Sequence, residues 1–299
     1  MATERELSKR IRSVRNISQV TSALSAVSAS KARKAQHQVM STRVYAGKAF
    51  EILHNVASQP GGAAHPLLTI RQEIKRSYLI LITGDRGLAG AYNTAIVAQT
   101  EKFIKALPGP CDVVAVGRKG RDLMIRRKYN VIASFDGLPD SPAITDITPI
   151  AQIVVDDYLE GKVDQVFVAY TDFVNLVTRI PRVKQLLPLK PLDFEGMAVA
   201  EYVQTVDLSG VAERAYTYEP SVEGLLDVIV PRFTDLQLYQ AVLEALASEH
   251  SARMVAMNNA TDNANVLIDE LTLARNKARQ TNITNEMLDI AGGAEALAG

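Results

Sequence analysis

The two ends of the chain are long stretches almost free of the residues that stop helices. From Thr3 to about Ser58 there is no proline and a single glycine, Gly47, and from Thr234 to Ala291 there is neither. This predicts helices far longer than the ~11–12 residues of an average globular helix. At ~1.5 Å per residue each would reach roughly 80 Å. Two rods of this kind are typical of a mechanical or connecting part and direct the search away from a pocket.

The first helix has a start signal and one apolar face. Thr3 and Glu6 have the spacing of a capping box, in which two otherwise unpaired backbone N–H groups are satisfied. The chain from Ser22 to Ala35 is mostly Ser and Ala, so a neighbouring helix or a surrounding wall can approach it closely. The predicted buried stripe, at steps of three and four residues, is Leu7, Ile11, Val14, Ile17 or Val20, Leu24 and Val27.

The last helix carries a seven-residue repeat. We expect it to open at a second capping box, Thr234-x-x-Gln237, with Phe233 and Leu238 as a hydrophobic staple. A short helix at about 221–229 would lead into it through Pro231. One heptad series is Leu236, Leu243, His250, Met257, Ala264, Leu271 and Ala278, and its companion is Tyr239, Leu246, Arg253, Ala260, Leu267 and Ala274. Such a repeat predicts a left-handed coiled coil, looser where its core is polar or small.

The first helix is the partner of matching length, and the middle of the chain joins the two at one end, so the pair should be antiparallel.

The sequence of the middle of the chain predicts an alternating α/β domain. Its strands are expected at 78–83, 112–116, 131–135 and 163–170, and its helices at about 91–106, 118–128 and 146–160. This alternation is typical of a Rossmann-like, mostly parallel sheet.

A further strand within 174–186 would pair antiparallel with 163–170 through a turn at Thr171-Asp172, and 187–215 is interpreted as loop. The predicted fold class is therefore α/β plus a long antiparallel coiled coil. The expected division is a coiled-coil helix at 1–59, a Rossmann-like domain at 60–231 and a second coiled-coil helix at 232–299.

Charge is balanced over the chain but not along it. Residues 1–48 hold ten Lys and Arg against two acids, net +8, whereas residues 235–299 hold four against nine, net −5. Opposite charge suits two helices lying side by side, although solvated faces explain part of it. A basic nucleic-acid-binding helix is the third interpretation, and salt-dependent DNA binding would be its sign. We expect no nucleic-acid partner, because no aromatic side chain interleaves the basic residues and the pI is near 6.9.

Composition also indicates a compartment. No apolar run approaches the ~20 residues that cross a bilayer. The charged start, Met-Ala-Thr-Glu-Arg, is unlike a signal peptide, and the acids in it argue against an organellar transit peptide. The only cysteine is Cys111, so no internal disulfide is possible. These features predict a cytoplasmic protein.

A glycine-containing loop, Thr83 to Gly90, follows the first strand and opens a helix, where a dinucleotide-binding loop would lie. Its spacing is G-x-x-G-x-x-G rather than G-x-G-x-x-G, and Asp85 would face the pyrophosphate. A structural turn or a protein contact is therefore favoured over a nucleotide site. A Rossmann-type oxidoreductase with helical extensions stays open as the alternative, and tight NAD or FAD binding would favour it.

Other reactive residue types form no catalytic or metal pattern. His37, His54, His65 and His250 share no ligand spacing, so we expect no metal and interpret them as solvated or core histidines. Cys111 opens an apolar strand, which favours a buried structural thiol. The pairs Asp156-Asp157 and Asp269-Glu270 are sequence neighbours on helices and do not share a helix face.

Several blocks resemble one known family. They are Arg10–Asn16, Ala29–Gln36, Gly84–Asn93, Tyr218–Pro220, Ser248–Met257, Ala260–Ala264, Asn276–Gln280 and Ile283-Thr284. Together they resemble the gamma subunit of bacterial F-type ATP synthase over essentially the whole chain. The C-terminal blocks are the most specific.

The resemblance implies a rotor shaft without an active site, cofactor or small-molecule substrate. In that family the coil enters a hexamer of alpha and beta subunits, and the Rossmann-like domain meets the epsilon subunit and the membrane c-ring. One copy per complex, on the cytoplasmic side of the bacterial inner membrane, would couple proton flow to ATP synthesis as a peripheral membrane protein.

By motif position, Arg253, Arg279, Gln280 and Thr284 resemble residues that meet the beta-subunit catch loop, and Tyr218 and Glu219 resemble residues at the c-ring. Leu24 stands where many relatives have methionine, on a face near a beta subunit. Ala89 replaces a common cysteine, and 187–215 has no cysteine pair, so a plastid-type redox switch is not expected.

Overall fold

The long helices at both ends of the chain are present. The computed structural model describes residues 3–58, 65–189 and 221–298. The chain forms two compact units, one from Met1–Val27 with Met254–Gly299 and the other from Ser28–Arg253. Helix α1 (Glu4–Ala57, 54 residues) and helix α6 (Val222–Ala298, 77 residues) each run through both units. The capping box is confirmed, because Thr3 Oγ1 accepts from the Glu6 N–H at 3.3 Å and Glu6 Oε2 from the Thr3 N–H at 3.0 Å.

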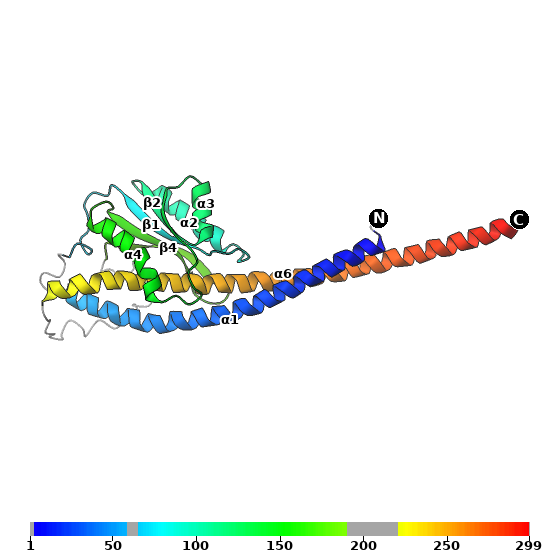
Figure 1. Cartoon of the computed structure of the whole chain (residues 1–299), viewed down its shortest axis with the longest axis horizontal. Helices are drawn as coiled ribbons and strands as arrows, with labels where there is room; N and C mark the ends of the chain where they lie inside the picture. The colour runs from blue at the N-terminus through cyan, green and yellow to red at the C-terminus, as the bar shows by residue number, and fades with distance from the viewer. Residues whose placement is uncertain (1–2, 59–64, 190–220, 299) are drawn as a thin grey trace. The chain divides into compact units, whose positions relative to one another are not determined.

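The second unit contains a five-stranded sheet of order β3-β2-β1-β4-β5 (Figure 1). The strands are β1 (Ser77–Ile82), β2 (Cys111–Val116), β3 (Val131–Phe135), β4 (Gln165–Phe173) and β5 (Arg179–Leu187). The first four are parallel, and β5 pairs antiparallel with β4. This confirms the predicted Rossmann-like, mostly parallel sheet.

Helices cover both faces of this sheet. Helices α2 (Tyr92–Ala106), α3 (Arg118–Arg126) and α4 (Ile144–Leu159) connect the parallel strands. Side chains of β1 alternate between the faces, as the two-residue period of a strand requires. Leu79 and Leu81 pack with α2 and α3, whereas the side chains on the other face of β1, such as Ile80, pack with α4, α1 and α6.

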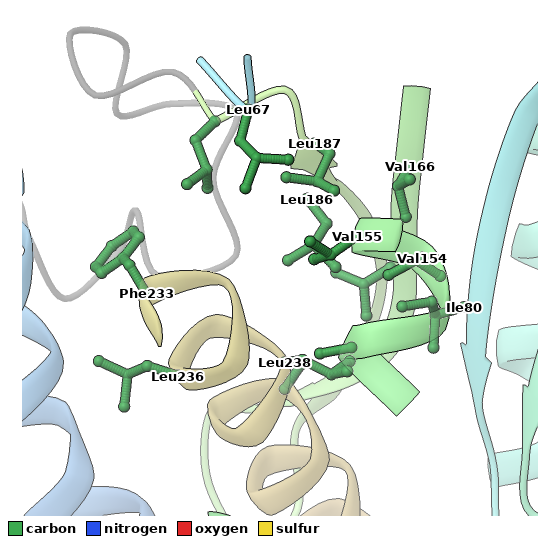
Figure 2. Close-up of a cluster of buried hydrophobic side chains, with 14 of the residues drawn as sticks. Leu67, Ile80, Val154, Val155, Val166, Leu186, Leu187, Phe233, Leu236 and Leu238 are labelled. Atoms are coloured by element: carbon green, nitrogen blue, oxygen red, sulfur yellow. The ribbon is translucent and has the colours of Figure 1, made fainter. Parts of the chain in front are cut away.

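The larger core joins α6 to the sheet within the second unit. Figure 2 shows Leu238 of α6 pointing toward the side chains of α4 and the sheet, with Phe233 and Leu236 on the other side of the helix, and all three belong to one buried cluster. The ring of Phe233 also lies 6.0 Å from that of Phe50 on α1, measured between centroids. Burying an aromatic side chain of this size stabilises a fold by about 1.5–3 kcal/mol. One apolar core therefore holds both long helices and the sheet in this unit.

Helix α6 begins earlier than predicted. It starts at Val222 and continues through Pro231, so no new helix opens at Thr234. The second capping box is wrong, because the Thr234 hydroxyl donates to the Val230 carbonyl inside the helix at 3.1 Å. Burial of the flanking apolar side chains outweighs the one backbone hydrogen bond that proline removes. The three-part division at 59/60 and 231/232 stays a prediction.

The hairpin between β4 and β5 turns later than predicted. Thr171 and Asp172 are buried strand residues, and Asp172 Oδ2 lies 2.8 Å from Arg182 Nε on β5. The turn lies at 174–178, where Asn175 Oδ1 accepts from the N–H groups of Val177 and Thr178 at 2.9 and 2.7 Å. An asparagine that bonds to nearby backbone in this way stabilises a turn.

In the first unit, α1 and α6 pair antiparallel. Ser18 Oγ donates to Asn265 Oδ1 at 2.9 Å, and the hydroxyl oxygens of Thr21 and Thr261 lie 2.7 Å apart. Ser25 Oγ, further along α1, donates to Asn258 Oδ1. Residue numbers on α6 fall as those on α1 rise, which confirms the predicted antiparallel arrangement.

The seam of this pair is more polar than predicted. In this unit the buried or half-buried positions on α1 are Glu4, Leu7, Ile11, Val14, Ser18, Thr21, Leu24 and Ser25. Ile17, Val20 and Val27 were predicted in the stripe but are exposed by 52%, 57% and 53%. The seam keeps a seven-residue period, which selects Ser18 and Thr21 over their apolar neighbours. Their hydroxyl groups are satisfied by hydrogen bonds across the pair.

The companion heptad series on α6 is also corrected in the first unit. Leu267 and Ala274 are exposed, whereas Thr261, Ile268 and Arg275, one residue after the predicted positions, are half-buried. The first series is retained, with Met257 and Ala264 buried and Leu271 and Ala278 half-buried. Among these, Thr261 bonds across the pair to Thr21, a contact that apolar content alone did not identify.

Candidate functional site

The C-terminal part of α6 is exposed all around in the first unit. Every described side chain from 279 to 294 is exposed. The bond between Ser18 and Asn265 places the start of α1, Glu4, opposite about residue 279 of α6. Beyond that point α6 has no helical partner among the described residues. Large apolar side chains remain on this helix: Ile283, Met287, Leu288 and Ile290, exposed by 47%, 67%, 64% and 74%.

Three of the predicted site residues lie on this exposed part of α6. Arg279 and Gln280 are followed by Thr284, whose hydroxyl donates to the Gln280 carbonyl at 2.9 Å. Arg279 shares a helix face with Ile283 because residues four apart are neighbours. The surface thus combines a forked cationic donor, an amide and a hydroxyl with apolar contact area. Such a surface suits another protein better than a small molecule.

Leu24 lies beside a second apolar surface of the first unit. It is half-buried, and Ile17, Val20 and Val27 on the same side of α1 are exposed. Their spacing of three and four residues forms one stripe along the outside of the helix. The structure therefore brings Leu24 into a surface stripe that is available for contact.

Arg253 lies in a different environment, at the end of the second unit. Its side chain is 12% exposed and pairs with Glu249 one turn earlier. Arg253 Nε also donates to the Gly87 carbonyl at 3.4 Å, and one of its terminal nitrogens lies 3.4 Å from His250 Nδ1. The structure does not place it on the same surface as Arg279, Gln280 and Thr284. Tyr218 and Glu219 lie outside the described residues.

The loop from Thr83 to Gly90 is filled by the protein itself. A Cβ on Gly84 would lie 2.6 Å from Oε1 of Glu249, and the Gly84 N–H donates to Asn93 Oδ1 at 2.9 Å. Asp85 accepts from the N–H of Arg118 at 2.9 Å and of Gly137 at 2.8 Å. The chain's own side chains and backbone thus pack against this loop, which favours a structural role for it over a dinucleotide site.

Cys111, His65 and His250 of the second unit are each at least partly buried. Burial, with a smaller contribution from Asp112, raises the pKa of Cys111 to about 12, which makes it a poor nucleophile. Burial and then the Arg253 guanidinium lower the pKa of His250 to about 4. Burial also lowers the pKa of His65, against the nearby Asp227. In the described part of the chain, no three His, Cys, Asp or Glu side chains gather as metal ligands.

Sequence reasoning missed Glu249, which is buried against the glycine loop. Burial raises its pKa, and the Arg253 guanidinium opposes that shift. The available signal was an acid on α6 flanked at helical spacing by Ala245 and Ala252, both buried.

Among the described residues, none of the helices combines the length and the apolar composition that a membrane span requires.

Comparison with known proteins assigns a family to this arrangement. The family model described as ATP synthase matches residues 3–297. The chain is 44% identical over 302 residues to the ATP synthase gamma chain of Roseiflexus castenholzii, covering 100% of this chain and 99% of that protein. It is also 44% identical over 300 residues to the ATP synthase gamma chain of Dehalococcoides mccartyi, covering 100% of both.

Solved structures have the same fold. A chain of the Euglena gracilis mitochondrial ATP synthase, described as OSCP, F1 and c-ring, gives a TM-score of 0.65 at 19% identity, covering 98% of this chain and 94% of that one. A chain of the Tetrahymena thermophila mitochondrial ATP synthase, described as central stalk and c-ring, gives a TM-score of 0.59 at 23% identity, covering 81% of this chain and 99% of that one. With the full-length sequence matches, the paired end helices and the parallel sheet place this chain in the family of ATP synthase gamma chains.

Proposed function

We propose that this chain is the central rotor shaft of a proton-driven F-type ATP synthase. It would pass rotation of the membrane c-ring to the hexamer of alpha and beta subunits and so couple proton flow to ATP synthesis. The observation that carries the proposal is the full-length match to ATP synthase gamma chains. The antiparallel pairing of α1 and α6 supports it, because torque needs a stiff element.

The proposed contact with the beta-subunit catch loop is the exposed part of α6. Arg279, Gln280 and Thr284 supply donors that can engage carboxylates and release them in turn. The apolar stripe beside Leu24 is proposed to lie near a beta subunit. Arg253 is proposed for the catch-loop contact as well, although most of its side chain is buried.

We propose that the chain has no active site of its own and acts on sites in other subunits. An asymmetric shaft offers a different surface to each beta subunit as it turns. A subunit that binds two surfaces with different free energies changes conformation between them, and its affinity for nucleotide changes with it. No group in this chain needs to touch the nucleotide.

The foot of the rotor is proposed to be the Rossmann-like domain, with the c-ring contact at Tyr218 and Glu219. The epsilon subunit would share this end, with one copy of the chain per complex. The protein would then be a peripheral membrane protein on the cytoplasmic side of the inner membrane.

Reconstitution tests the proposal. Alpha and beta subunits are assembled with and without this chain, and ATP hydrolysis and rotation of a bead attached to the chain are recorded. The expected result is steady hydrolysis with stepwise rotation only in the complex that contains the chain. Equal hydrolysis without the chain, together with a bead that does not turn, would reject the rotor function.

A further inference from the structure

The glycine loop after β1 holds one face of α6 in the second unit. Ala89 of this loop and Tyr92, the first residue of α2, form a buried cluster with Ala252. Tyr92 Oη donates to the Ala245 carbonyl at 3.0 Å. Because Ala245 and Ala252 lie seven residues apart, both contacts fall on the same side of α6.

Glu249 lies between these two contacts, in the space that Gly84 leaves. A Cβ added to Gly84 would lie 2.6 Å from both the Cδ and the Oε1 of Glu249, and 2.9 Å from its other oxygen. Real Cβ atoms do not come this close, so the glycine is required by the approach of the carboxylate. The Glu249 side chain is 10% exposed.

Arg253 closes the arrangement. Its guanidinium pairs with the Glu249 carboxylate and donates to the Gly87 carbonyl at 3.4 Å. The loop therefore receives a carboxylate at Gly84 and a guanidinium at Gly87, both from the last two turns of α6 in this unit. Leaving either charge buried without the other would be costly.

The C-terminal part of strand β4, at the same edge of the sheet, holds α6 as well. Ser248 Oγ donates to the carbonyl of Thr171, near the end of β4, at 3.0 Å. Strands β1 and β4 are parallel neighbours, so their C-terminal ends lie side by side. Helix α6 is thus bonded to the sheet at two points, at Gly87 after β1 and at Thr171 near the end of β4.

We propose that Glu249 and Arg253, seated on Gly84 and Gly87, form a clamp that makes the sheet and α6 rotate as one body. We name this group of four residues the α6 clamp. The inference rests on the proposed rotor function and adds to it the residues that transmit torque between the Rossmann-like domain and the helix. Glu249 and Arg253 are positioning residues, because they fix the orientation of α6 relative to the sheet.

The test measures rigidity in assembled complexes. Lys105, exposed on α2, is replaced by cysteine in a Cys111→Ser background, and a bead is attached there while the beta subunits are fixed to a surface. The torsional stiffness of the bead is obtained from its angular spread between steps, alongside the ATP hydrolysis rate. The variants are Gly84→Ala, Glu249→Ala and Glu249→Gln, with Glu223→Ala as a control that removes an exposed acid from α6.

Gly84→Ala and Glu249→Ala should each lower the stiffness relative to the parent, because each removes one contact of a coupled pair. Gly84→Ala combined with Glu249→Ala should be no worse than either alone, because the methyl group then enters the space the carboxylate has left. Glu249→Gln should retain most of the stiffness, since its side-chain oxygen still accepts from Arg253. Glu223→Ala should match the parent.

A loss of stability alone lowers the yield of complex but not the stiffness of the complexes that assemble. If Gly84→Ala does not assemble, Glu249→Ala carries the test, because it adds no atoms. A parent bead that rotates, with unchanged stiffness in Glu249→Ala, overturns the clamp and leaves the rotor function standing. A parent bead that does not rotate overturns the rotor function and the clamp together.

Discussion

The hydroxyl oxygens of Thr21 on α1 and Thr261 on α6 lie 2.7 Å apart in the seam of the antiparallel pair. Each hydroxyl also has a backbone acceptor one turn earlier, Ile17 O at 3.1 Å and Met257 O at 2.9 Å. The Thr21–Thr261 contact is one of three successive polar contacts in the seam, with Ser18–Asn265 and Ser25–Asn258 on either side. Polar layers of this kind fix the register of a helix pair at a cost in stability.

Replacing one threonine by valine should therefore cost more than replacing both. Thr21→Val or Thr261→Val alone should lower the free energy of unfolding by about 0.5–1 kcal/mol, because the remaining hydroxyl keeps only its backbone acceptor and loses its partner across the seam. The double variant should recover most of this loss through apolar contact, a coupling of about 1 kcal/mol. Urea unfolding of the full chain measures all four states. Thr281→Val, which removes an exposed hydroxyl bonded only to Lys277 O, is the matched control.

Asp85 joins three loops, so its loss should weaken the sheet edge. Its carboxylate accepts from two backbone N–H groups, at Arg118 after β2 and at Gly137 after β3. Asp85→Ala should lower the free energy of unfolding by about 2–3 kcal/mol, because both donors lose a charged acceptor. The free energy of unfolding of Asp85→Asn should fall between those of the parent and Asp85→Ala, since one acceptor oxygen remains. Asp122→Ala, at a 51% exposed side chain, should be near neutral in the same denaturation assay. Equal effects of Asp85→Ala and Asp122→Ala would contradict this role.

Much of the fold could be predicted from the sequence because its signals were long or repeated. The strand expected at 131–135 is β3, and the strand expected at 112–116 differs from β2 by one residue. The end helices followed from the missing helix breakers alone. The register of the coiled coil was harder to predict, because Ser18 and Thr21 are not apolar. They stabilise the helix pair only because Asn265 and Thr261 lie opposite them.

Long-range packing decided the other differences. Pro231 looked like a helix boundary, yet buried neighbours keep α6 continuous through it. The role of Gly84 was hidden because the residue that needs its missing side chain, Glu249, lies far away in the sequence. A glycine pattern alone could not separate a phosphate cradle from a seat for a carboxylate of the same chain. Arg253 was found by motif, but only its contacts show that the guanidinium is mostly buried.

His250 should make the second unit less stable as the pH falls below neutrality. Burial, then Arg253 on its own helix and Lys31 on α1, lower the pKa of His250 to about 4, while Asp140 opposes them. The unfolded chain, with an ordinary histidine pKa near 6.5, takes up a proton between these values and the folded chain does not. Stability that is present above about pH 6.5 is thus lost as the pH falls towards about 4.

Comparison with His250→Asn isolates this contribution. Between about pH 7 and about pH 5 the parent chain should lose about 2 kcal/mol more of its unfolding free energy than the variant. Glu249 acts in the opposite direction, since burial raises its pKa, and it is common to both proteins. Urea unfolding at the two pH values gives the difference. Equal losses in the two proteins would show that the proton on His250 is not linked to folding.

Charge reversal at Arg279 should impair coupling without affecting the fold. The side chain lies on the exposed part of α6, where surface substitutions change stability by about 0.5 kcal/mol or less. If its guanidinium engages a beta-subunit carboxylate, Arg279→Glu should lower ATP synthesis in reconstituted vesicles by about tenfold, the equivalent of ~1.4 kcal/mol. Arg279→Lys should give an intermediate rate of ATP synthesis, because lysine keeps the charge but lacks the planar fork.

Lys277→Glu makes the same charge change at an exposed side chain two residues away and should leave the rate of ATP synthesis within about twofold of the parent. Equal synthesis in Arg279→Glu and Lys277→Glu, with unchanged melting temperatures, would remove Arg279 from the proposed contact, whereas a loss confined to Arg279→Glu would place the exposed helix against the beta subunit.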